Sequence, residues 1–342
     1  MGFVVFSDFH ANLWQEFSQP DSEFGNTRFK EMIQVLEKVI KVARENTADI
    51  IFTGDLFHQR SKVNTLVYNK IYELINDTDD LNWYLLRGNH DSVDNSLSSE
   101  TSLYPFKGDH VKLISNLETF TAQDTNFVAV PYGDEVEDMK SFIKENVNNL
   151  DKTKTNILLG HFGVDGATTG PHSHRLEGAI GLGDLYINDF DSVLLGHYHN
   201  RQALGGNPNA VYVGNTMPTS FGDINQDKGV YYFESGKDFK GLEFIPIKSK
   251  QFVTIEGSDV PDDLEEIMEN NYVRFKGTPK QAEILKDNVS NVRVEVEREF
   301  EHNARLEGVN ATSTPEEVVK AYAKEHYPSA VDKALECLRE AI

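Results

Sequence analysis

Apolar residues in the first 200 positions follow two alternating patterns. Short, nearly continuous apolar runs, which are typical of buried strands, lie at 2–7, 49–53, 82–87, 155–160 and 191–195. Segments with apolar residues three and four positions apart, which indicate amphipathic helices, lie among them at 28–46, 62–76 and 135–149. Because strands alternate with helices, the pattern predicts a layered α/β core.

Beyond about residue 200 the pattern becomes β-rich, with Gly turns between runs at 209–214, 228–235 and 241–247. A strand–helix–strand–helix–strand order then follows at 252–256, 262–269, 272–276, 279–288 and 291–297. Two further helices are predicted at 315–326 and 329–341, the first with Thr314 as N-cap, Pro315 at its first position and Glu317 completing a capping box. We therefore expect a large α/β domain over 1–248, a small α+β domain over 249–300 and a helical segment over 301–342.

Composition narrows the class of protein. The single cysteine, Cys337, excludes an internal disulfide and fits a reducing, intracellular setting. The chain starts with a strand-like run in place of a signal peptide, and no apolar run reaches the ~20 residues that span a bilayer, so we expect a cytoplasmic protein. The net charge of -22 argues against coating nucleic acid by charge alone. The negative charge is still compatible with a nucleic-acid enzyme, because bound metals and a local basic groove can attract phosphate.

Five short polar segments interrupt this pattern, each at the end of a predicted strand. They are Asp8-Phe9-His10, Gly54-Asp55, Gly88-Asn89-His90-Asp91, Gly160-His161 and Gly196-His197-Tyr198-His199. Open α/β sheets place their sites at the carboxyl ends of strands. Together the segments supply enough nitrogen and oxygen ligands for two divalent metals, which predicts metal-dependent attack on a phosphate ester.

The chemistry of such a pair assigns expected roles. Two metals about 3.5–4 Å apart can clamp the attacking and leaving oxygens of a displacement at phosphorus, and Asp55 is the candidate bridging carboxylate. Alternation along a strand end would point Asp8 and His10 to one face, and likewise His197 and His199. The mixed imidazole and carboxylate set suits Mn²⁺, Fe²⁺ or Zn²⁺ better than Mg²⁺.

The third segment adds a neutral oxygen ligand and a candidate catalytic group. Asn89 offers its side-chain carbonyl oxygen. His90 adjoins it and is placed to meet the scissile phosphate or the leaving group. We expect Asp91 to hold the His90 imidazole in one tautomer.

The order of these motifs resembles the calcineurin-like metallophosphoesterases, whose pattern is Asp-x-His, Gly-Asp, Gly-Asn-His-Asp/Glu, His and Gly-His-x-His. More finely, the chain resembles the SbcD-type double-strand-break repair nucleases. That likeness rests on the segments 54–58, 190–199, 213–216, 220–222 and 228–230. The resemblance extends over roughly residues 1–235, and it implies an α-β-β-α sandwich with a small α+β capping domain and C-terminal helices.

The resemblance also implies residue roles. It implies two sets of metal ligands that share one carboxylate: Asp8, His10, Asp55 and His199, and then Asp55, Asn89, His161 and His197. His90 would act near the transition state and leaving group, with Asp91 beside it. His58 would help to place the strand for exonuclease action.

The family further implies an activity and partners. These are Mn²⁺-dependent cleavage of duplex ends from the three-prime side, with Mg or Fe as other possible metals, and single-strand endonuclease activity in DNA repair and recombination. A homodimer is implied, with helices at 62–76 and after His90 as the suspected interface. The partner would be an SbcC-type ATPase whose coiled coil binds residues 315–341. The compact length is most similar to the bacteriophage members.

Rival interpretations stay open at this stage. A phosphatase or a hydrolase of small phosphodiesters would keep the fold, although Gly54-Asp55 is followed by Leu56-Phe57-His58 where phosphatases have Val-Asp-Arg-Gly. A scaffold with vestigial metals is the other rival. His172 and His174 are expected to be solvated loop residues. Arg60 either contacts a DNA phosphate or begins a solvated helix. The 315–326 helix either packs on its own chain or docks on the partner.

Overall fold

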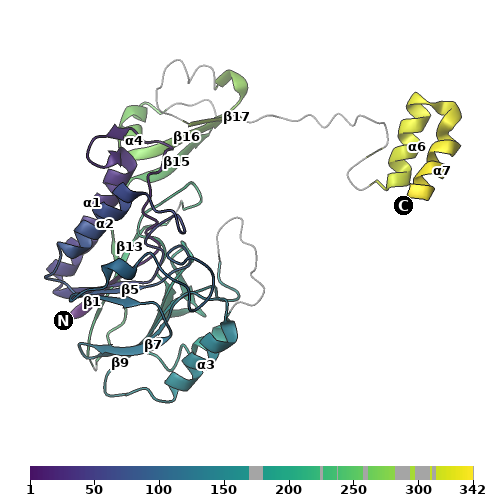
Figure 1. The fold of residues 1–342 in the computed structure, drawn as a ribbon. Helices are drawn as coiled ribbons and strands as arrows, with labels where there is room; N and C mark the ends of the chain where they lie inside the picture. Colours follow the sequence, from purple (N-terminus) through teal and green to yellow (C-terminus); the bar gives the residue numbers. More distant parts are fainter. Residues whose placement is uncertain are drawn as a thin grey trace. The chain divides into compact units, whose positions relative to one another are not determined.

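The computed structural model describes residues 1–168, 180–223, 226–236, 238–256, 261–281, 293–296, 309 and 313–341. The chain divides into two compact units, Met1–Glu295 and Val296–Ile342, which are drawn in Figure 1. His172, His174 and most of the helix expected at 279–288 lie outside the described residues.

Two six-stranded sheets form the centre of the first unit. The first sheet has β1 and β4 at its middle, with parallel β5 and β6 on one side. On the other side β13 runs antiparallel to β1, and β14 runs antiparallel to β13. Its strands, in spatial order, are β14 (Glu243–Pro246), β13 (Gly229–Glu234), β1 (Gly2–Phe6), β4 (Ala48–Phe52), β5 (Trp83–Leu86) and β6 (Val111–Ile114).

The second sheet has four parallel strands, with one antiparallel strand at each edge. Its strands, in spatial order, are β11 (Gln202–Leu204), β12 (Asn207–Tyr212), β10 (Ser192–Gly196), β9 (Thr155–His161), β8 (Thr125–Val130) and β7 (Glu118–Ala122). Buried side chains from both sheets, among them Val5 of β1 and Leu159 of β9, form one apolar cluster between them.

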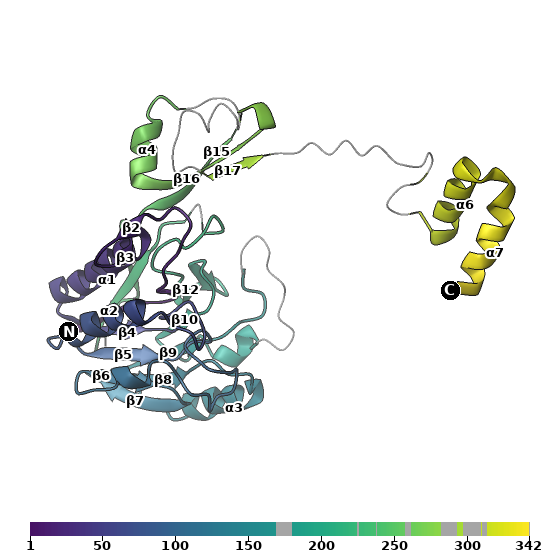
Figure 2. The same cartoon turned by 45° about the horizontal axis from the view of Figure 1, so that its top comes forward.

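Helices cover the two outer faces of this pair of sheets. Helices α1 (Thr27–Glu45) and α2 (Thr65–Asn76) pack on the first sheet, and α3 (Val136–Val147) packs on the second (Figures 1 and 2). In α1 the apolar spacing puts Phe29, Leu36 and Val39 on the buried face. The layers therefore run α-β-β-α, which confirms the predicted fold class.

Four strands of the sandwich were not predicted, and one of them is the three-residue edge strand β11. β6 has only four residues, and β7 is an edge strand whose threonines alternate with apolar residues. β8 pairs with β7 as a hairpin and completes the second sheet. The helix expected after His90 was also wrong, because residues 91–103 form turns and a Ser92–Thr101 bridge before the short helix η1 (Tyr104–Phe106).

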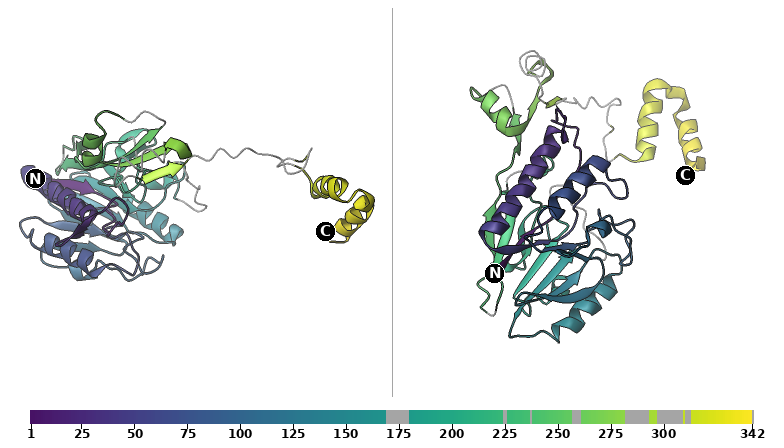
Figure 3. Two further views of the ribbon diagram at one scale, coloured as in Figure 1. Left: turned by 90° about the horizontal axis from the view of Figure 1, so that it is seen from above. Right: turned by 60° about the vertical axis from the view of Figure 1, so that its left-hand side comes forward.

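A small α+β element follows the sandwich within the first unit. It has three strands, β15 (Gln251–Glu256), β16 (Asn271–Gly277) and β17 (Arg293–Val296), with α4 (Leu264–Asn270) between the first two. We call the strands and helix of this element the cap. Its small apolar core contains Leu264, Val273 and Phe275. The hairpin of β2 (Pro20–Asp21) and β3 (Gly25–Asn26) precedes α1 and is labelled in Figure 2. Figure 3 draws the same ribbon from two further sides.

The second unit is a helical hairpin of α6 (Pro315–His326), η3 (Pro328–Ala330) and α7 (Val331–Ala341). The predicted capping box is present, since Thr314 N–H donates to Glu317 at 2.8 Å and Glu317 N–H donates back to the Thr314 hydroxyl at 3.3 Å. Only Ala323 is buried among the described side chains of the hairpin, whereas Tyr322 is 50% exposed. Across the described part of the chain, every helix is too short or too polar to cross a bilayer.

Candidate metal centre

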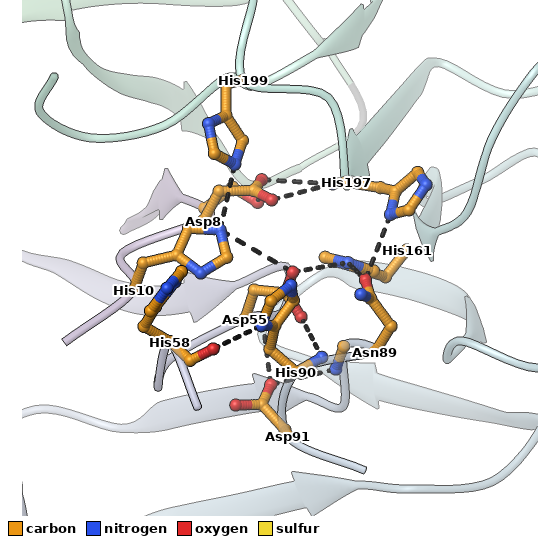
Figure 4. A network of polar contacts seen from close by, with 12 residues as sticks. Asp8, His10, Asp55, His58, Asn89, His90, Asp91, His161, His197 and His199 are labelled. Atoms are coloured by element: carbon orange, nitrogen blue, oxygen red, sulfur yellow. Dashed lines mark hydrogen bonds and ion pairs between the residues drawn. The ribbon is translucent and has the colours of Figure 1, made fainter. Parts of the chain in front are cut away.

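Five loops meet at the carboxyl ends of β1, β4, β5, β9 and β10. Because these strands are parallel within each sheet, their carboxyl ends share one edge of the sandwich. All seven predicted ligand side chains gather there, as Figure 4 shows. They are Asp8, His10, Asp55, Asn89, His161, His197 and His199.

Asp55 lies in the middle of this cluster and is 2% exposed. Its Oδ2 lies 3.4 Å from Nε2 of His161 on one side and 3.8 Å from Nε2 of His10 on the other. Its Oδ1 accepts the backbone N–H of His90 at 2.8 Å. The Asp55 carboxylate therefore faces two groups of imidazoles at once, as a bridging ligand must.

The group on one side consists of Asp8, His10 and His199, and we call it, with Asp55, the first ligand group. Nε2 of His10 lies 3.0 Å from Nε2 of His199. The ligand atoms of Asp8, His10 and His199 all lie within 4.8 Å of one another. Asp8 also accepts the His197 backbone N–H at 3.1 Å, which ties the first polar segment to the last.

The group on the other side consists of Asn89, His161 and His197, and we call it, with Asp55, the second ligand group. Oδ1 of Asn89 lies 3.0 Å from Nε2 of His161 and 3.1 Å from Nδ1 of His197. Nδ1 of His161 lies 2.7 Å from the carbonyl oxygen of Thr53. A proton on Nδ1 satisfies that carbonyl and leaves the Nε2 lone pair for a metal.

Asp8 and His10 face one ligand group, as expected, but strand alternation does not place them there. β1 ends at Phe6 and β10 at Gly196, so the ligands that follow lie in turns. Asp8, His10 and Asp55 have φ values of 49°, 51° and 65°, and His197 has 98°. Left-handed backbone of this kind is costly for residues with a Cβ and is typical of functional sites.

The two histidines of the last segment consequently diverge. His197 turns toward Asn89 in the second ligand group, whereas His199 turns toward His10 in the first. They do not share a face, in contrast to the expectation. The divergence is what lets one segment contribute to both groups.

Glycines next to the ligands permit a close backbone approach. A Cβ on Gly88 would lie 2.2 Å from Oδ1 of Asp55, and one on Gly54 would lie 2.2 Å from Nδ1 of His161. Gly54 also has a φ of 106°, a conformation that L residues with a side chain rarely adopt. These two glycines therefore let the backbone approach the side chains of Asp55 and His161 closely.

His58 and His90 lie beside the first ligand group. Their rings stack with centroids 5.6 Å apart, and the His90 centroid lies 4.8 Å from that of His10. Nδ1 of His90 lies 2.5 Å from the carbonyl oxygen of His58, which fixes the orientation of the ring. Trp14 packs on the other side of His58, with centroids 4.3 Å apart.

Asp91 does not hold the His90 imidazole, so that expectation was wrong. Its carboxylate is 1% exposed and accepts backbone N–H groups from Asp55 at 2.8 Å, Leu56 at 2.9 Å and Gly88 at 3.0 Å. The turn after β4 leaves these N–H groups without strand partners, and a buried acceptor satisfies them. Asp91 therefore fastens the Asp55 loop to the Gly88 loop.

Two contacts with the ligand loops were not anticipated from the sequence. Arg60 donates to the Asn89 carbonyl oxygen at 2.8 Å and to Oδ1 of Asn95 at 2.6 Å, so it serves the loop itself. Oδ1 of Asp223 lies 3.4 Å from Nδ1 of His199. The surrounding segment 220–222 carried part of the family resemblance, but nothing in its pattern singled out Asp223.

Burial and mutual attraction perturb the acids and bases of the centre. Burial opposes the charged form of His161, but attraction by Asp55 and then Asp8 outweighs it and raises the pKa of His161 to about 9. Burial likewise opposes the Asp55 carboxylate, yet His161 and His10 hold the pKa of Asp55 well below its usual range. Burial, reinforced by His161, lowers the pKa of His197 to about 3. The centre thus keeps Asp55 charged and His197 neutral, as metal ligands require.

The donor set fits two divalent ions. It offers four imidazoles, two carboxylates and one amide oxygen around a shared Asp55, a mixture suited to Mn²⁺, Fe²⁺ or Zn²⁺. The histidines His10, His58 and His90 form another close triad. Their role as metal ligands or catalytic groups stays a prediction.

Comparisons with known proteins identify relatives of this chain. The SbcD subunit of nuclease SbcCD from Staphylococcus saprophyticus is 23% identical over 282 residues that span 74% of this chain and 73% of the relative. The SbcD subunit from Staphylococcus epidermidis is 28% identical over 143 residues, or 40% of this chain and 38% of the relative. A dimetal phosphatase from Danio rerio is 10% identical, with a TM-score of 0.40 over 72% of this chain and 97% of that one. The family model for calcineurin-like phosphoesterases matches residues 1–201, and the chain therefore belongs to this family of phosphoester hydrolases.

Proposed function

We propose that this chain is a dimetal-dependent DNA nuclease, the nuclease subunit of an SbcCD-like complex in DNA repair and recombination. Its activities are duplex exonuclease cleavage from the three-prime side and single-strand endonuclease cleavage. The observation that carries the proposal is the placement of Asp55 between two ligand groups at one edge of the sandwich. The two staphylococcal relatives, which are named as subunits of a nuclease, support the choice of DNA as substrate.

The proposal assigns seven residues as metal ligands. Asp8, His10 and His199 hold one ion, Asn89, His161 and His197 hold the other, and Asp55 serves both. Manganese is the favoured metal, with iron or magnesium as the other choices. When bound, two such ions supply a Lewis-acidic clamp for the oxygens of the phosphate undergoing displacement.

The protein groups around the ligands orient the substrate and handle protons. His90 is half-buried beside the first ligand group, and the His58 carbonyl fixes its Nδ1. With Nδ1–H directed at that carbonyl, Nε2 faces the site, and in the imidazolium form of the ring Nε2 can give its proton to the departing sugar oxygen. The His58 ring stacks on His90 and would steer the strand end toward it. Asp91 acts on the loops and does not touch the substrate.

We also propose a domain organisation and a partner for this chain. The nuclease domain is 1–248, the capping domain 249–300 and the partner-binding segment 301–342, in an intracellular homodimer. The α6–α7 hairpin is too small to bury a core of its own, and Tyr322 of α6 is half exposed. We propose that residues 315–341 bind the coiled coil of an SbcC-type ATPase. A full-length Tyr322→Asp variant that still binds that coiled coil would remove this assignment.

The test of the substrate compares four phosphoesters with the purified chain and Mn²⁺. These are duplex DNA labelled at either end, circular single-stranded DNA, a bis-aryl phosphodiester and a phosphopeptide. Release of mononucleotides from the three-prime end and opening of the circle would support the nuclease. Turnover of the bis-aryl ester alone would favour a hydrolase of small phosphodiesters, and dephosphorylation of a phosphopeptide would favour a phosphatase. No turnover of any substrate would favour the scaffold.

A further inference from the structure

A buried carboxylate lies behind one of the proposed ligands. Asp223 is 4% exposed, and its Oδ1 lies 3.4 Å from Nδ1 of His199. The other ring nitrogen of His199, Nε2, faces the first ligand group, where it lies 3.0 Å from Nε2 of His10. The two nitrogens of the His199 ring therefore have separate neighbours on opposite sides.

Asp223 is itself held so that one oxygen remains for the histidine. Its Oδ2 accepts the backbone N–H of Thr219 at 2.9 Å, the Thr219 hydroxyl at 2.8 Å and the backbone N–H of Ser220 at 3.2 Å. These three bonds fix the carboxylate plane, while Oδ1 stays directed at His199. An ionised carboxylate can only accept, so it favours the tautomer with its proton on Nδ1 and leaves the Nε2 lone pair free.

Arg28, at the start of α1, holds the loop that carries Asp223 by hydrogen bonds. The guanidinium donates to the Thr219 carbonyl oxygen at 3.1 Å and to that of Glu16 at 3.2 Å. Its central carbon lies 5.3 Å from the ring centroid of Phe252 in β15 and 4.8 Å from that of Tyr272 in β16. Arg28 is 3% exposed, so these rings and carbonyls replace its water.

A second contact joins the same loop to the cap. The guanidinium of Arg274 in β16 lies 3.9 Å from the ring centroid of Phe221, and the Phe221 ring packs against Phe252 with centroids 4.8 Å apart. Arg28 and Arg274 thus contact the loop on both sides of Ser220, at Thr219 and at Phe221. The contacts therefore connect the strands of the cap with the His199 ring through Arg28, the Thr219 backbone and Asp223.

We infer that Asp223 is a positioning residue that fixes the His199 imidazole with Nε2 toward the metal, and that Arg28 couples this position to the cap. The inference rests on the proposed function in taking His199 as a metal ligand. It adds that the affinity of the first ligand group, and not of the second, depends on the loop under the cap.

The test is Mn²⁺ binding to the metal-free full chain, measured by calorimetry and by the electron paramagnetic resonance of free Mn²⁺. Asp223→Asn keeps the shape but weakens the acceptor, and is expected to lower the affinity of one of two sites by about 10–100-fold. Arg28→Lys, which cannot bridge two carbonyls with a planar fork, is expected to weaken the same site. Thermal unfolding of each metal-free variant establishes that it is folded.

The chain offers a matched control. Asp151 also accepts a threonine backbone N–H and hydroxyl, at 2.9 Å and 2.7 Å from Thr153, but on an exposed turn. Asp151→Asn should leave both Mn²⁺ affinities at wild-type values. If folded Asp223→Asn binds Mn²⁺ at both sites with wild-type affinity, the inference is overturned and the proposed function is not. A wild-type chain that binds no Mn²⁺ would overturn the proposed function and the inference with it.

Discussion

The carboxylate of Asp91 accepts the backbone N–H of Asp55 at 2.8 Å. The same buried carboxylate also accepts the N–H of Gly88, so one side chain joins the loop after β4 to the loop after β5. The distance between Asp55 and Asn89, which belong to those two loops, is thereby set by a residue that reaches neither metal nor substrate.

Replacing Asp91 should therefore loosen the fold as well as the centre. Asp91→Asn presents an NH₂ group to N–H donors and leaves at least one of them unsatisfied, which costs about 1–3 kcal/mol. We expect the free energy of unfolding of the metal-free chain in urea to fall by that amount. Asp109→Asn, on an exposed turn, is the control and should change it little. Equal stability of the two variants would contradict the role given to Asp91.

A methyl group at Gly88 should act on Asp55 directly. Its Cβ would lie 2.2 Å from the Asp55 carboxylate, so Asp55 must move out of its place between the two ligand groups. We expect Gly88→Ala to lose Mn²⁺ binding at both sites and at least 100-fold in phosphodiester turnover, roughly the effect of misplacing a reacting group by 1 Å. Gly183→Ala, where a Cβ meets nothing within 4 Å, should behave as wild type. Intact turnover in Gly88→Ala would show that Asp55 tolerates displacement.

Metal binding should release protons near neutral pH. In the metal-free chain Asp55 and Asp8 raise the pKa of His161 to about 9 against the effect of burial, so the ring is protonated at pH 7. A metal must displace that proton, and its affinity for the second ligand group should rise by about tenfold per unit from pH 7 to 9 and then level off. Calorimetry in buffers of different ionisation enthalpy measures the proton count. An affinity independent of pH over this range would contradict protonation of His161.

His90 should be needed for turnover and dispensable for metal binding. Its ring lies beside the first ligand group, with Nδ1 against the His58 carbonyl. Loss of a general acid costs about 10²–10⁴-fold in rate, so we expect His90→Ala to bind two Mn²⁺ and to cleave that much more slowly. His110→Ala is the control, because Nε2 of His110 lies 3.1 Å from the carbonyl oxygen of Ile75 in α2 and not among the ligand loops. Normal cleavage by His90→Ala would remove it from the mechanism.

Much of the sandwich could be predicted because its buried strands are continuous apolar runs. β1, β4 and β9 could be recognised, since every residue of each strand is buried and each strand contains an unbroken apolar run. The β7–β8 hairpin was not predicted, because β7 lies at a sheet edge and exposes every second residue. An edge strand of this kind has the composition of a loop, and only its pairing in the folded chain reveals it.

The gathering of the ligand side chains was also predictable, because parallel strands bring their carboxyl ends together. Their orientation was not, because Asp8 and His197 turn through left-handed backbone that leaves no mark in the apolar pattern. Asp91 and Asp223 illustrate a second limit. Each acts through contacts with backbone N–H groups or with a histidine distant in sequence, and such partners are known only once the loops are placed.

We propose that the centre around Asp55 cleaves DNA. The most direct measurement is degradation of duplex DNA labelled at its five-prime end by the purified chain with Mn²⁺, compared with Asp55→Asn at equal protein concentration. We expect progressive shortening from the three-prime end by the wild type, none by Asp55→Asn, and none by either in excess chelator. Equal degradation by both proteins would contradict the proposal, because cleavage would then arise elsewhere than at this centre.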